Sequence, residues 1–404
     1  MRLAIFTAQI APYHNARYIG AMKYFREVHV ISTLNAGEFV QFLATDVGYY
    51  AVHRIYDGRE AYDAGARTGE LANRIREKLS TIRPDAIAAS GWTAPENLVA
   101  LAHGREHRIP VIVMSESQSD DAPRSLLREL VKRKVVSQFD AALVGGSPHA
   151  EYVARLGIDR KRIHFGYNAV DNDHFCRGAG VARASADATR LKHGLPKSYL
   201  LASARFVTKK NLPNLIAAYC AARREVADAP DLVILGDGPE RASIESAIVA
   251  GGDSRHVHLP GFRGYEDLPE FYGLAEAFAH VSTVEQWGLV INEAMAAGVP
   301  VIVSNRCGAA RSVVDHGVSG ILTGTEVSEI TRSLLQFLKL TPRERAAMGR
   351  AAASAIADWG PDRFGTGLKR AVESALSIPR RGPIAPWDSI ILRYLQTKVL
   401  DAVA

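Results

Sequence analysis

Short apolar runs alternate with longer segments of helical periodicity over the first 165 residues. The apolar runs are expected to be β-strands and fall at residues 2–7, 28–32, 85–89, 111–114, 141–144 and 162–165. The intervening segments are long enough for helical crossover connections between parallel strands. Strands this short and apolar are typical of sheets that are buried on both faces. The pattern therefore predicts an α/β domain with a mainly parallel sheet.

The alternation breaks after Asn168 and then begins again. An irregular stretch is followed by a segment rich in Gly, Ala and Ser. The second set of strands is expected at residues 199–204, 232–235, 256–259, 277–281 and 301–303, followed by helices over 326–376 and a last helix at about 388–403. We therefore predict an N-terminal domain at 1–170, a linker at 171–190, a C-terminal domain at 191–380 and a C-terminal segment at 381–404 that packs back on the first domain.

Composition narrows the class of protein. The chain has 404 residues, 47% of them hydrophobic and 23% charged, which fits two folded domains and excludes extended disorder. Its net charge of +6 favours acidic small molecules or a membrane surface over nucleic acid. Three widely spaced cysteines suggest neither a disulfide framework nor a metal knuckle. The cysteine pattern suits a reducing compartment, so we expect a cytoplasmic protein. No apolar run reaches the ~20 residues of a spanning helix, which leaves peripheral attachment at the inner face of the membrane as an open alternative.

The most informative segment is 281–303. A strand ends there, a polar loop carries Glu285, and a helix begins near Gly288 and stops at a glycine and a proline. Ligands of open parallel sheets bind just beyond the carboxyl ends of the strands. Glu285 and Glu293 are eight residues apart, which is about 12 Å along a helix and suits opposite ends of a nucleotide sugar.

Several residues near this segment are candidates for binding a phosphorylated ligand. Glu293 lies among Ile, Ala and Met, so its carboxylate needs a polar partner, either paired ribose hydroxyls or a neighbouring arginine. The helix that begins near Gly288 points free N–H groups toward the same region. Arg205 and Lys210 follow the strand at 199–204, where they either contact the same phosphates or belong to a solvated loop.

Together these motifs resemble retaining GT-B glycosyltransferases of family four. The resemblance rests on Arg205 with Lys210, on Gly236-Asp-Gly-Pro-Glu240, on the two glutamates in Glu-x7-Glu and on the following Ala-Met-Ala-Ala-Gly-Val-Pro-Val-Ile. It is strongest over roughly residues 195–360 and includes the Asn168-Ala-Val-Asp171 stretch. It implies two Rossmann-like domains that face each other across a cleft, with the nucleotide sugar bound mainly by the second.

The resemblance also implies roles for individual residues. Glu285, Arg205 and Lys210 would be catalytic, with Glu285 on donor-sugar hydroxyls and the two cations on the departing diphosphate. Arg263 lies in a loop similar to the one that recognises the base through its backbone. The residues implied for donor binding are Gly288, Leu289, Glu293, Arg263 and Gly236. The resemblance also implies a UDP-linked donor and a front-face reaction without a cofactor or a protein nucleophile. No metal is expected, because fixed cations stabilise the leaving diphosphate.

The acceptor side is less defined. His14 and Arg17 follow the first strand, where many relatives carry a glycine-rich loop that this chain lacks. Glu116 stands near a position where relatives often have histidine, and Trp92 is either a stacking platform for an acceptor sugar or a core residue. A glycan, a lipid-linked molecule or a small molecule remains open as acceptor. The basic, leucine-rich segment 124–134 either lies on anionic lipid or forms a solvated helix face.

Two further motifs and two other functions compete with this interpretation. Asp171-Asn172-Asp173 has the Asp-x-Asp form of metal-dependent transferases, but its place in the expected linker argues against a metal site. Gly236-Asp-Gly-Pro-Glu240 lacks the third glycine of a dinucleotide fingerprint, which argues against an NAD enzyme. A nucleotide-sugar epimerase of the same architecture and a catalytically silent nucleotide-sugar-binding module are the alternatives to a transferase.

Overall fold

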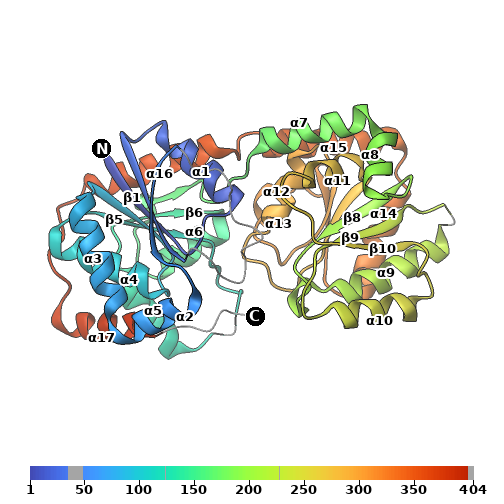
Figure 1. Cartoon of the computed structure of the whole chain (residues 1–404). Helices are drawn as coiled ribbons and strands as arrows, with labels where there is room; N and C mark the ends of the chain where they lie inside the picture. The colour runs from blue at the N-terminus through green and yellow to red at the C-terminus, as the bar shows by residue number, and fades with distance from the viewer. Residues whose placement is uncertain (35–48, 123, 227, 399–404) are drawn as a thin grey trace. The chain divides into compact units, whose positions relative to one another are not determined.

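The chain folds into two compact units, each built around its own sheet (Figure 1). The computed structural model describes residues 1–34, 49–122, 124–226 and 228–398. The first unit comprises Met1–Ala169 and Pro361–Ala404, and the second comprises Val170–Gly360. The α/β class predicted from the hydrophobic pattern is confirmed, while the cleft between the domains stays a prediction.

The described part of the first unit contains a seven-stranded parallel sheet with the order β3-β2-β1-β4-β5-β6-β7. Successive residues of β1 point to opposite faces, so that Leu3 and Ile5 pack in one apolar cluster and Ala4 and Phe6 in the other. The strands are β1 (Arg2–Thr7), β2 (Glu27–Leu34), β3 (Ala51–Tyr56), β4 (Ala86–Ser90), β5 (Val111–Ser115), β6 (Ala141–Val144) and β7 (Ile163–Phe165). The helices are α1 (Pro12–Met22), α2 (Arg59–Thr68), α3 (Glu70–Ile82), α4 (Pro95–His107), α5 (Leu126–Val136), α6 (Ser147–Arg155), α16 (Pro361–Leu376) and α17 (Pro386–Gln396).

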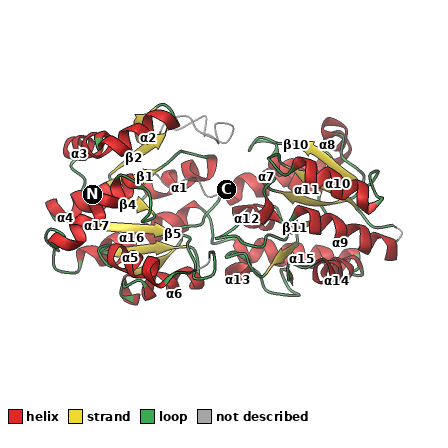
Figure 2. Ribbon diagram, turned by 90° about the horizontal axis from the view of Figure 1, so that it is seen from below, coloured by secondary structure: helices red, strands yellow, loops and turns green. Residues whose placement is uncertain are grey.

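The second unit repeats this plan with a six-stranded parallel sheet, in the order β10-β9-β8-β11-β12-β13, among its described residues. The strands are β8 (Tyr199–Ser203), β9 (Asp231–Leu235), β10 (Val257–Gly261), β11 (Ala277–His280), β12 (Val301–Ser304) and β13 (Gly320–Thr323). The helices are α7 (Asn172–Ala184), α8 (Ala186–His193), α9 (Leu212–Glu225), α10 (Arg241–Gly251), α11 (Leu268–Leu274), α12 (Leu289–Ala296), α13 (Ala310–Val313), α14 (Val327–Leu338) and α15 (Pro342–Ile356). Figure 2 shows strands flanked by helices in both units.

The structure differs from the predicted linker at residues 171–190. These residues form α7 and part of α8, and they belong to the second unit. The Asp171 carboxylate accepts a hydrogen bond of 3.0 Å from the His174 N–H and so caps the start of α7. Phe175 and Ala179 of α7 are buried in the core of the second unit. The Gly, Ala and Ser content that suggested a linker is compatible with a packed helix.

A second difference concerns residues 361–380, which were expected in the C-terminal domain. They include α16, which packs on α1 in the first unit. Glycines allow this close approach: a Cβ at Gly20 would lie 2.2 Å from the Pro361 oxygen, and one at Gly365 would lie 2.5 Å from the Gly20 oxygen. Phe364 and Leu368 fill the same apolar cluster as β1.

The C-terminal helix α17 also lies on the first unit, as the resemblance implies. Gln396 donates from Nε2 to the Leu98 carbonyl of α4 at 3.1 Å, and Leu392 is buried in the same core as α4. Within the described ranges, the structure contains no helix with the length and apolar character that crossing a bilayer requires.

Candidate active site

Two loops at the carboxyl ends of β8 and β11 are joined directly in the second unit. The two strands are neighbours in the sheet at the position where the strand order reverses direction along the chain. The backbone N–H of Thr283 donates to the carbonyl of Lys209 at 2.9 Å. The Asn211 side chain donates to the Val281 carbonyl at 3.2 Å and to the Thr325 carbonyl at 2.8 Å. These bonds fix the loop that carries Lys210 against the loop that carries Glu285.

Lys210 and Glu285 form an ion pair between these loops. Nζ of Lys210 contacts Oε2 of Glu285, and both side chains are largely buried, at 15% and 16% exposed. Nε2 of His280 lies 3.1 Å from the same oxygen, and the hydroxyl of Ser282 donates to it at 3.4 Å. Burial raises the pKa of the Glu285 carboxyl, but Lys210 and His280 outweigh burial and hold the pKa well below its usual range. Glu285 is therefore ionised at neutral pH.

The neighbourhood of this pair carries an excess of positive charge. Burial lowers the pKa of Lys209, and the nearby charges of Lys210 and Arg205 lower it further. Arg205, Lys209 and Lys210 thus bring three cations to the one carboxylate of Glu285 in these loops. An anionic ligand would relieve the repulsion among these three cations.

The turn at 236–240 is bound to the loop after β8. The N–H of Phe206 donates to the Asp237 carbonyl at 2.8 Å, and the N–H of Glu240 donates to the Phe206 carbonyl at 3.0 Å. Gly236 has φ +126°, and a Cβ there would lie 1.9 Å from the Ala204 oxygen. The absence of a side chain at Gly236 therefore permits the close approach of the two strand ends, and a direct contact with the donor stays a prediction.

Gly288 and Leu289 form the start of α12, as the sequence predicts. Gly288 precedes the helix with φ +95°, a conformation that favours glycine. The first N–H groups of a helix have no partner within it, so this end is suited to an anion. The neighbouring Trp287 is fully buried, and its Nε1 donates to Oδ1 of Asn292 at 2.9 Å, which anchors the loop to the helix.

Glu293 of α12 has a tyrosine as its polar partner. The Tyr272 hydroxyl donates to Oε2 of Glu293 at 2.9 Å, and Glu293 is 7% exposed. Burial raises the pKa of Glu293 to about 7, against which the bond from Tyr272 acts only partly. Among the described residues Glu293 thus bonds to a tyrosine, where the sequence suggested either ribose hydroxyls or an arginine.

Arg263, predicted near the base, follows β10. Its guanidinium lies over the Phe271 ring at 5.6 Å from the ring centre. Its Nε is buried and has no hydrogen-bond partner among the described residues. Its role in donor binding stays a prediction.

Two of the predicted acceptor residues, His14 and Arg17, have structural contacts in the first unit. His14 accepts a hydrogen bond of 3.2 Å from the Ala11 N–H at Nδ1, and burial lowers its pKa to about 3, so it offers no positive charge at neutral pH. Arg17 is almost fully buried, and its Nε donates to the Ala169 carbonyl at 2.9 Å. Its two terminal nitrogens have no hydrogen-bond partner among the described residues, which keeps Arg17 a candidate for an anionic group.

Trp92 and Glu116 lie at the ends of β4 and β5. Trp92 is 5% exposed and belongs to an apolar core of the first unit, with its ring 6.2 Å from that of Tyr152. This burial supports the core alternative over a platform for a sugar. Glu116 is half-buried just past β5, and its charge contributes to the raised pKa of Tyr167. Its part in acceptor binding stays a prediction.

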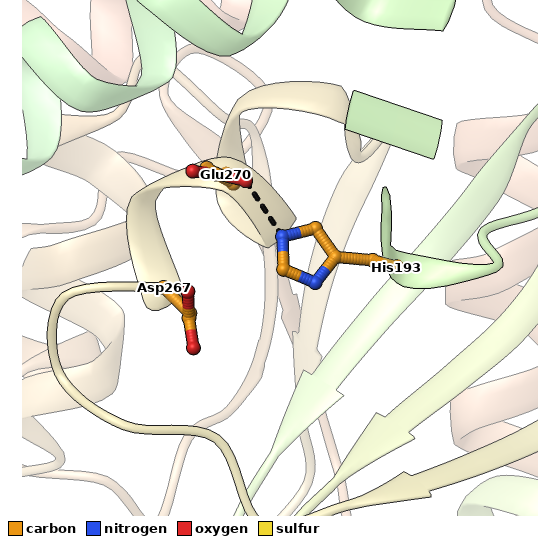
Figure 3. A group of neighbouring side chains, drawn as sticks. All are labelled: His193, Asp267 and Glu270. Carbon is orange, nitrogen blue, oxygen red and sulfur yellow. Dashed lines mark hydrogen bonds and ion pairs between the residues drawn. The ribbon is translucent and has the colours of Figure 1, made fainter. Parts of the chain in front are cut away.

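One further cluster has ligand types suitable for a metal. Figure 3 shows His193 of α8 directed at Glu270, with the Asp267 side chain beside them. His193 Nε2 lies 2.6 Å from Oε2 of Glu270. Nζ of Lys192 already contacts both carboxylates, at 2.8 Å from Glu270 and 3.6 Å from Asp267. This lysine supplies the compensating positive charge, so the cluster gives no argument for a metal.

Sequence reasoning missed four residues that contact or surround the predicted glutamates: Lys209, Tyr272, His280 and Ser282. His280 and Ser282 lie on the strand end just before Glu285 and alternate along it, which was the available signal. Tyr272 lies 21 positions before Glu293, and spacing gives no sign of that contact.

Comparison with known proteins agrees with this architecture. The family described as Glycosyl transferases group 1 matches residues 186–355, and the Glycosyl transferase 4-like domain matches residues 25–169. The GDP-mannose-dependent alpha-(1-6)-phosphatidylinositol monomannoside mannosyltransferase of Mycolicibacterium smegmatis is 32% identical over 73% of this chain and 81% of its own length. The D-inositol 3-phosphate glycosyltransferase of Salinispora tropica is 29% identical over 68% of this chain, which spans 59% of that relative.

Solved structures show the same fold. HepE of Anabaena, in complex with UDP, aligns over 93% of this chain and all of its own, with 19% identity and a TM-score of 0.73. WaaG, a glycosyltransferase involved in lipopolysaccharide biosynthesis, aligns over 91% of this chain and 98% of its own, with 14% identity and a TM-score of 0.65. With both family descriptions matched in order along one chain, this protein belongs to the group 1 glycosyltransferases of GT-B fold.

Proposed function

We propose that the protein transfers a sugar from a nucleoside-diphosphate sugar to a hydroxyl acceptor, with retention of anomeric configuration. The observation that carries this proposal is the Lys210–Glu285 pair, which lies beside Arg205 and Lys209 at adjacent strand ends. Three cations suit a diphosphate, and an ionised carboxylate suits sugar hydroxyls. Among the described residues of these two loops, this cluster combines positive charge with an ionised carboxylate.

The proposed reaction uses these groups in one step. The bond between the sugar and the diphosphate breaks while negative charge grows on the leaving oxygen, and Arg205, Lys210 and the N–H groups at Gly288 and Leu289 stabilise that charge. One preorganised donor of this kind is typically worth about 100- to 1,000-fold in rate. The acceptor hydroxyl attacks from the side where the diphosphate departs and gives its proton to a diphosphate oxygen. The chain then needs neither a metal nor a nucleophile of its own.

Donor binding would rearrange the ion pair. In the structure Lys210 is held by Glu285, whereas a diphosphate would offer Lys210 a stronger negative charge. Glu285 would then accept hydrogen bonds from sugar hydroxyls while His280 and Ser282 keep its carboxylate in place. Glu293, with its pKa of about 7, would bind ribose hydroxyls in its ionised form.

The nucleotide base and the acceptor are proposed from the named relatives and, for the acceptor, also from Arg17. The fold shared with HepE, solved with UDP, supports the expected UDP donor, whereas the M. smegmatis relative is named for GDP-mannose. Both relatives named above act on acceptors that contain inositol and phosphate, and the terminal nitrogens of Arg17 have no hydrogen-bond partner among the described residues. We propose a cytoplasmic enzyme with a UDP-sugar donor and an acceptor that bears an anionic group.

The test is a transfer assay with UDP-glucose, UDP-N-acetylglucosamine and GDP-mannose against inositol phosphates and phosphatidylinositol mannosides, with and without EDTA. We expect transfer with one donor, an α-linked product from an α-linked donor by NMR, and no loss in EDTA. Glu285→Ala and Lys210→Ala should nearly abolish transfer, while Lys197→Ala, at an exposed lysine of the same unit, should not. An isomerised sugar from donor alone would indicate an epimerase, and binding without turnover a silent module.

A further inference from the structure

Two helices of the first unit expose large apolar side chains to solvent. On α5 these are Leu126, Leu127 and Leu130, and on α17 they are Trp387, Ile390 and Tyr394. Leu126 is 88% exposed and Trp387 is 80% exposed. Isolated exposed apolar residues are ordinary, but contiguous apolar patches mark sites of interaction with proteins or membranes.

On each helix the exposed apolar residues share one face. Leu126 and Leu130 are four positions apart on α5, and Arg133 and Lys134 continue the same stripe one turn later. On α17, Trp387, Ile390 and Tyr394 follow helical spacing, whereas Leu392 and Gln396 point into the core. The exposed stripes are therefore not the sides that hold these helices on the unit.

The two stripes lie next to each other. Lys134 Nζ of α5 is 3.4 Å from Oδ1 of Asp388, the residue after Trp387. Gln138 Nε2, just past α5, is 3.4 Å from the other oxygen of Asp388. Helix α17 contacts both α4 and α5, and Figure 2 shows the three helices on the first unit. Leu130 lies one turn before Lys134 on α5, and Trp387 directly precedes Asp388 on α17, so the ends of the two apolar stripes adjoin at this ion pair.

The surface around these apolar residues is basic. Arg128, Arg133, Arg393 and Lys398 are exposed on or beside the two helices. The acidic residues within the two helices are Glu129 and Asp388. Glu129 is bonded to Lys132 and Asp388 is bonded to Lys134. Positive charge therefore predominates beside the exposed leucines and aromatic residues.

We propose that the exposed faces of α5 and α17 form one docking surface for a bilayer that contains anionic lipids. Leucine side chains with interspersed Lys and Arg insert at the boundary between headgroups and acyl chains, and Trp and Tyr favour that depth. Exposed arginines add attraction to anionic headgroups. The basic helix was visible in the sequence, but the apolar face that α17 adds beside it was not. Vesicle binding requires no nucleotide sugar, so this proposal is independent of the transfer reaction.

The test measures co-sedimentation of the full chain with vesicles of phosphatidylcholine alone and of phosphatidylcholine with about 30% phosphatidylglycerol. The first variant is Leu126→Ser/Leu127→Ser/Leu130→Ser, and the second is Trp387→Ser/Ile390→Ser/Tyr394→Ser. The third, Arg128→Ala/Arg133→Ala, leaves the Lys134–Asp388 contact intact. The matched control is Leu191→Ser/Val249→Ser, at two similarly exposed apolar residues of the second unit.

We expect the wild type to bind the anionic vesicles more strongly and to lose binding at high salt. Each apolar triple variant should lower the partition coefficient by about tenfold or more, the arginine variant should lower it only on anionic vesicles, and the control should match the wild type. Thermal melts by circular dichroism check that each variant is folded. Transfer to a soluble acceptor should be unchanged in every variant.

Three results would overturn the proposal. The α17 variant could bind like the wild type, which would leave α5 alone. The wild type could fail to bind anionic vesicles at low salt. Finally, analytical ultracentrifugation could show a dimer that the triple variants dissociate, which would make the surface an interface between two copies. Absence of transfer with intact vesicle binding would contradict only the proposed function.

Discussion

The two sheets share one strand order, yet the loops at equivalent positions carry different chemistry. β1 and β4 of the first unit occupy the places that β8 and β11 occupy in the second. The loops after β8 and β11 bring Lys210 to Glu285. The equivalent loops at 8–11 and 91–94 contain no acidic residue, lysine or arginine at all. Topology therefore determines where a site can form, and the loop residues determine what it does.

At this edge of its sheet the first unit has two large side chains with structural contacts, Trp92 and Arg17. Trp92 is in the core, and Arg17 lies with its guanidinium near the rings of Tyr13 and Tyr167, at 4.9 and 5.1 Å from their centres. Arg17 also holds the carbonyl of Ala169, the last residue of this unit before the chain enters the second. Truncation of Trp92 should therefore change stability, and truncation of Lys210 should change turnover.

The largest effect is expected for Trp92→Ala. Removing a buried indole from a packed core costs about 3–5 kcal/mol of unfolding free energy. The measurement is the unfolding transition of the first unit in urea, followed by circular dichroism. Below that transition the affinity for donor should be that of the wild type.

Trp387→Ala is the matched control for this change, because Trp387 is exposed and should change the unfolding free energy by less than about 0.5 kcal/mol. If Trp92→Ala unfolds like the wild type but loses acceptor affinity, Trp92 is a sugar platform and the contrast between the two units disappears.

Lys210→Ala tests the second unit, where we expect a loss of turnover. We expect kcat to fall by about 100- to 1,000-fold because one fixed cation is lost from the leaving diphosphate. Steady-state kinetics at neutral pH measures this, with Lys197→Ala as control. A variant with wild-type kcat and a raised KM would show that Lys210 only binds the donor in its ground state.

Residue spacing predicted the centre of the second unit's site but not its surroundings. Glu285, Lys210 and Gly288 were found because each follows a strand end or begins a helix, and the structure brings Glu285 and Lys210 together. Tyr272 was missed because it reaches Glu293 from another helix, which depends on tertiary packing. In the first unit, His14 and Trp92 could not be assigned because polarity and position do not reveal burial.

The fold followed the hydrophobic pattern wherever the strands were continuously apolar. β3 was missed because its first four residues are exposed or half-buried, and β13 because it is short and begins with glycine. The predicted domain boundaries were wrong for a different reason. Helix α16 belongs to the first unit and contacts α1 at Gly20. The local sequence of a helix does not indicate which of two sheets it packs on.

Glu293 provides a contrast within the second unit, because its carboxyl has a raised pKa where that of Glu285 is lowered. Its pKa is about 7 when folded and about 4.5 as the ordinary value. As pH rises between these values the unfolded chain loses the proton first, so the folded state is destabilised, and the penalty is complete above pH 7. Glu293→Gln removes this penalty and should be about 3 kcal/mol more stable than the wild type at pH 8, with little difference at pH 4.5.

Thermal melts at the two pH values measure this difference in stability. Glu225→Gln, at an exposed position of α9, is the control and should show no such pH dependence. Equal stability of Glu293→Gln and wild type at pH 8 would contradict a buried, costly carboxylate at this position.

The smallest effect is expected at His280, which acts on Glu285 and not on the substrate. Burial lowers the pKa of His280, so the ring is neutral at neutral pH and its Nε2, 3.1 Å from Oε2 of Glu285, serves as an N–H donor to the carboxylate. His280→Leu removes this donor, and we expect kcat to fall by about tenfold, in line with one lost hydrogen bond to a charged group. KM should change little, because the diphosphate contacts remain.

His280→Gln separates positioning from packing, because its amide restores an N–H donor without an imidazole. Recovery of most of the wild-type kcat in this variant, with no recovery in His280→Leu, assigns the effect to the bond with Glu285. Equal losses in both variants would assign it to the packing of a residue that is 3% exposed beside Phe278. An unchanged kcat in His280→Leu would mean that Lys210 and Ser282 suffice to orient Glu285. The orientation of Glu285 would then not depend on His280 of β11, and the contrast with the first unit would depend on the loop residues alone.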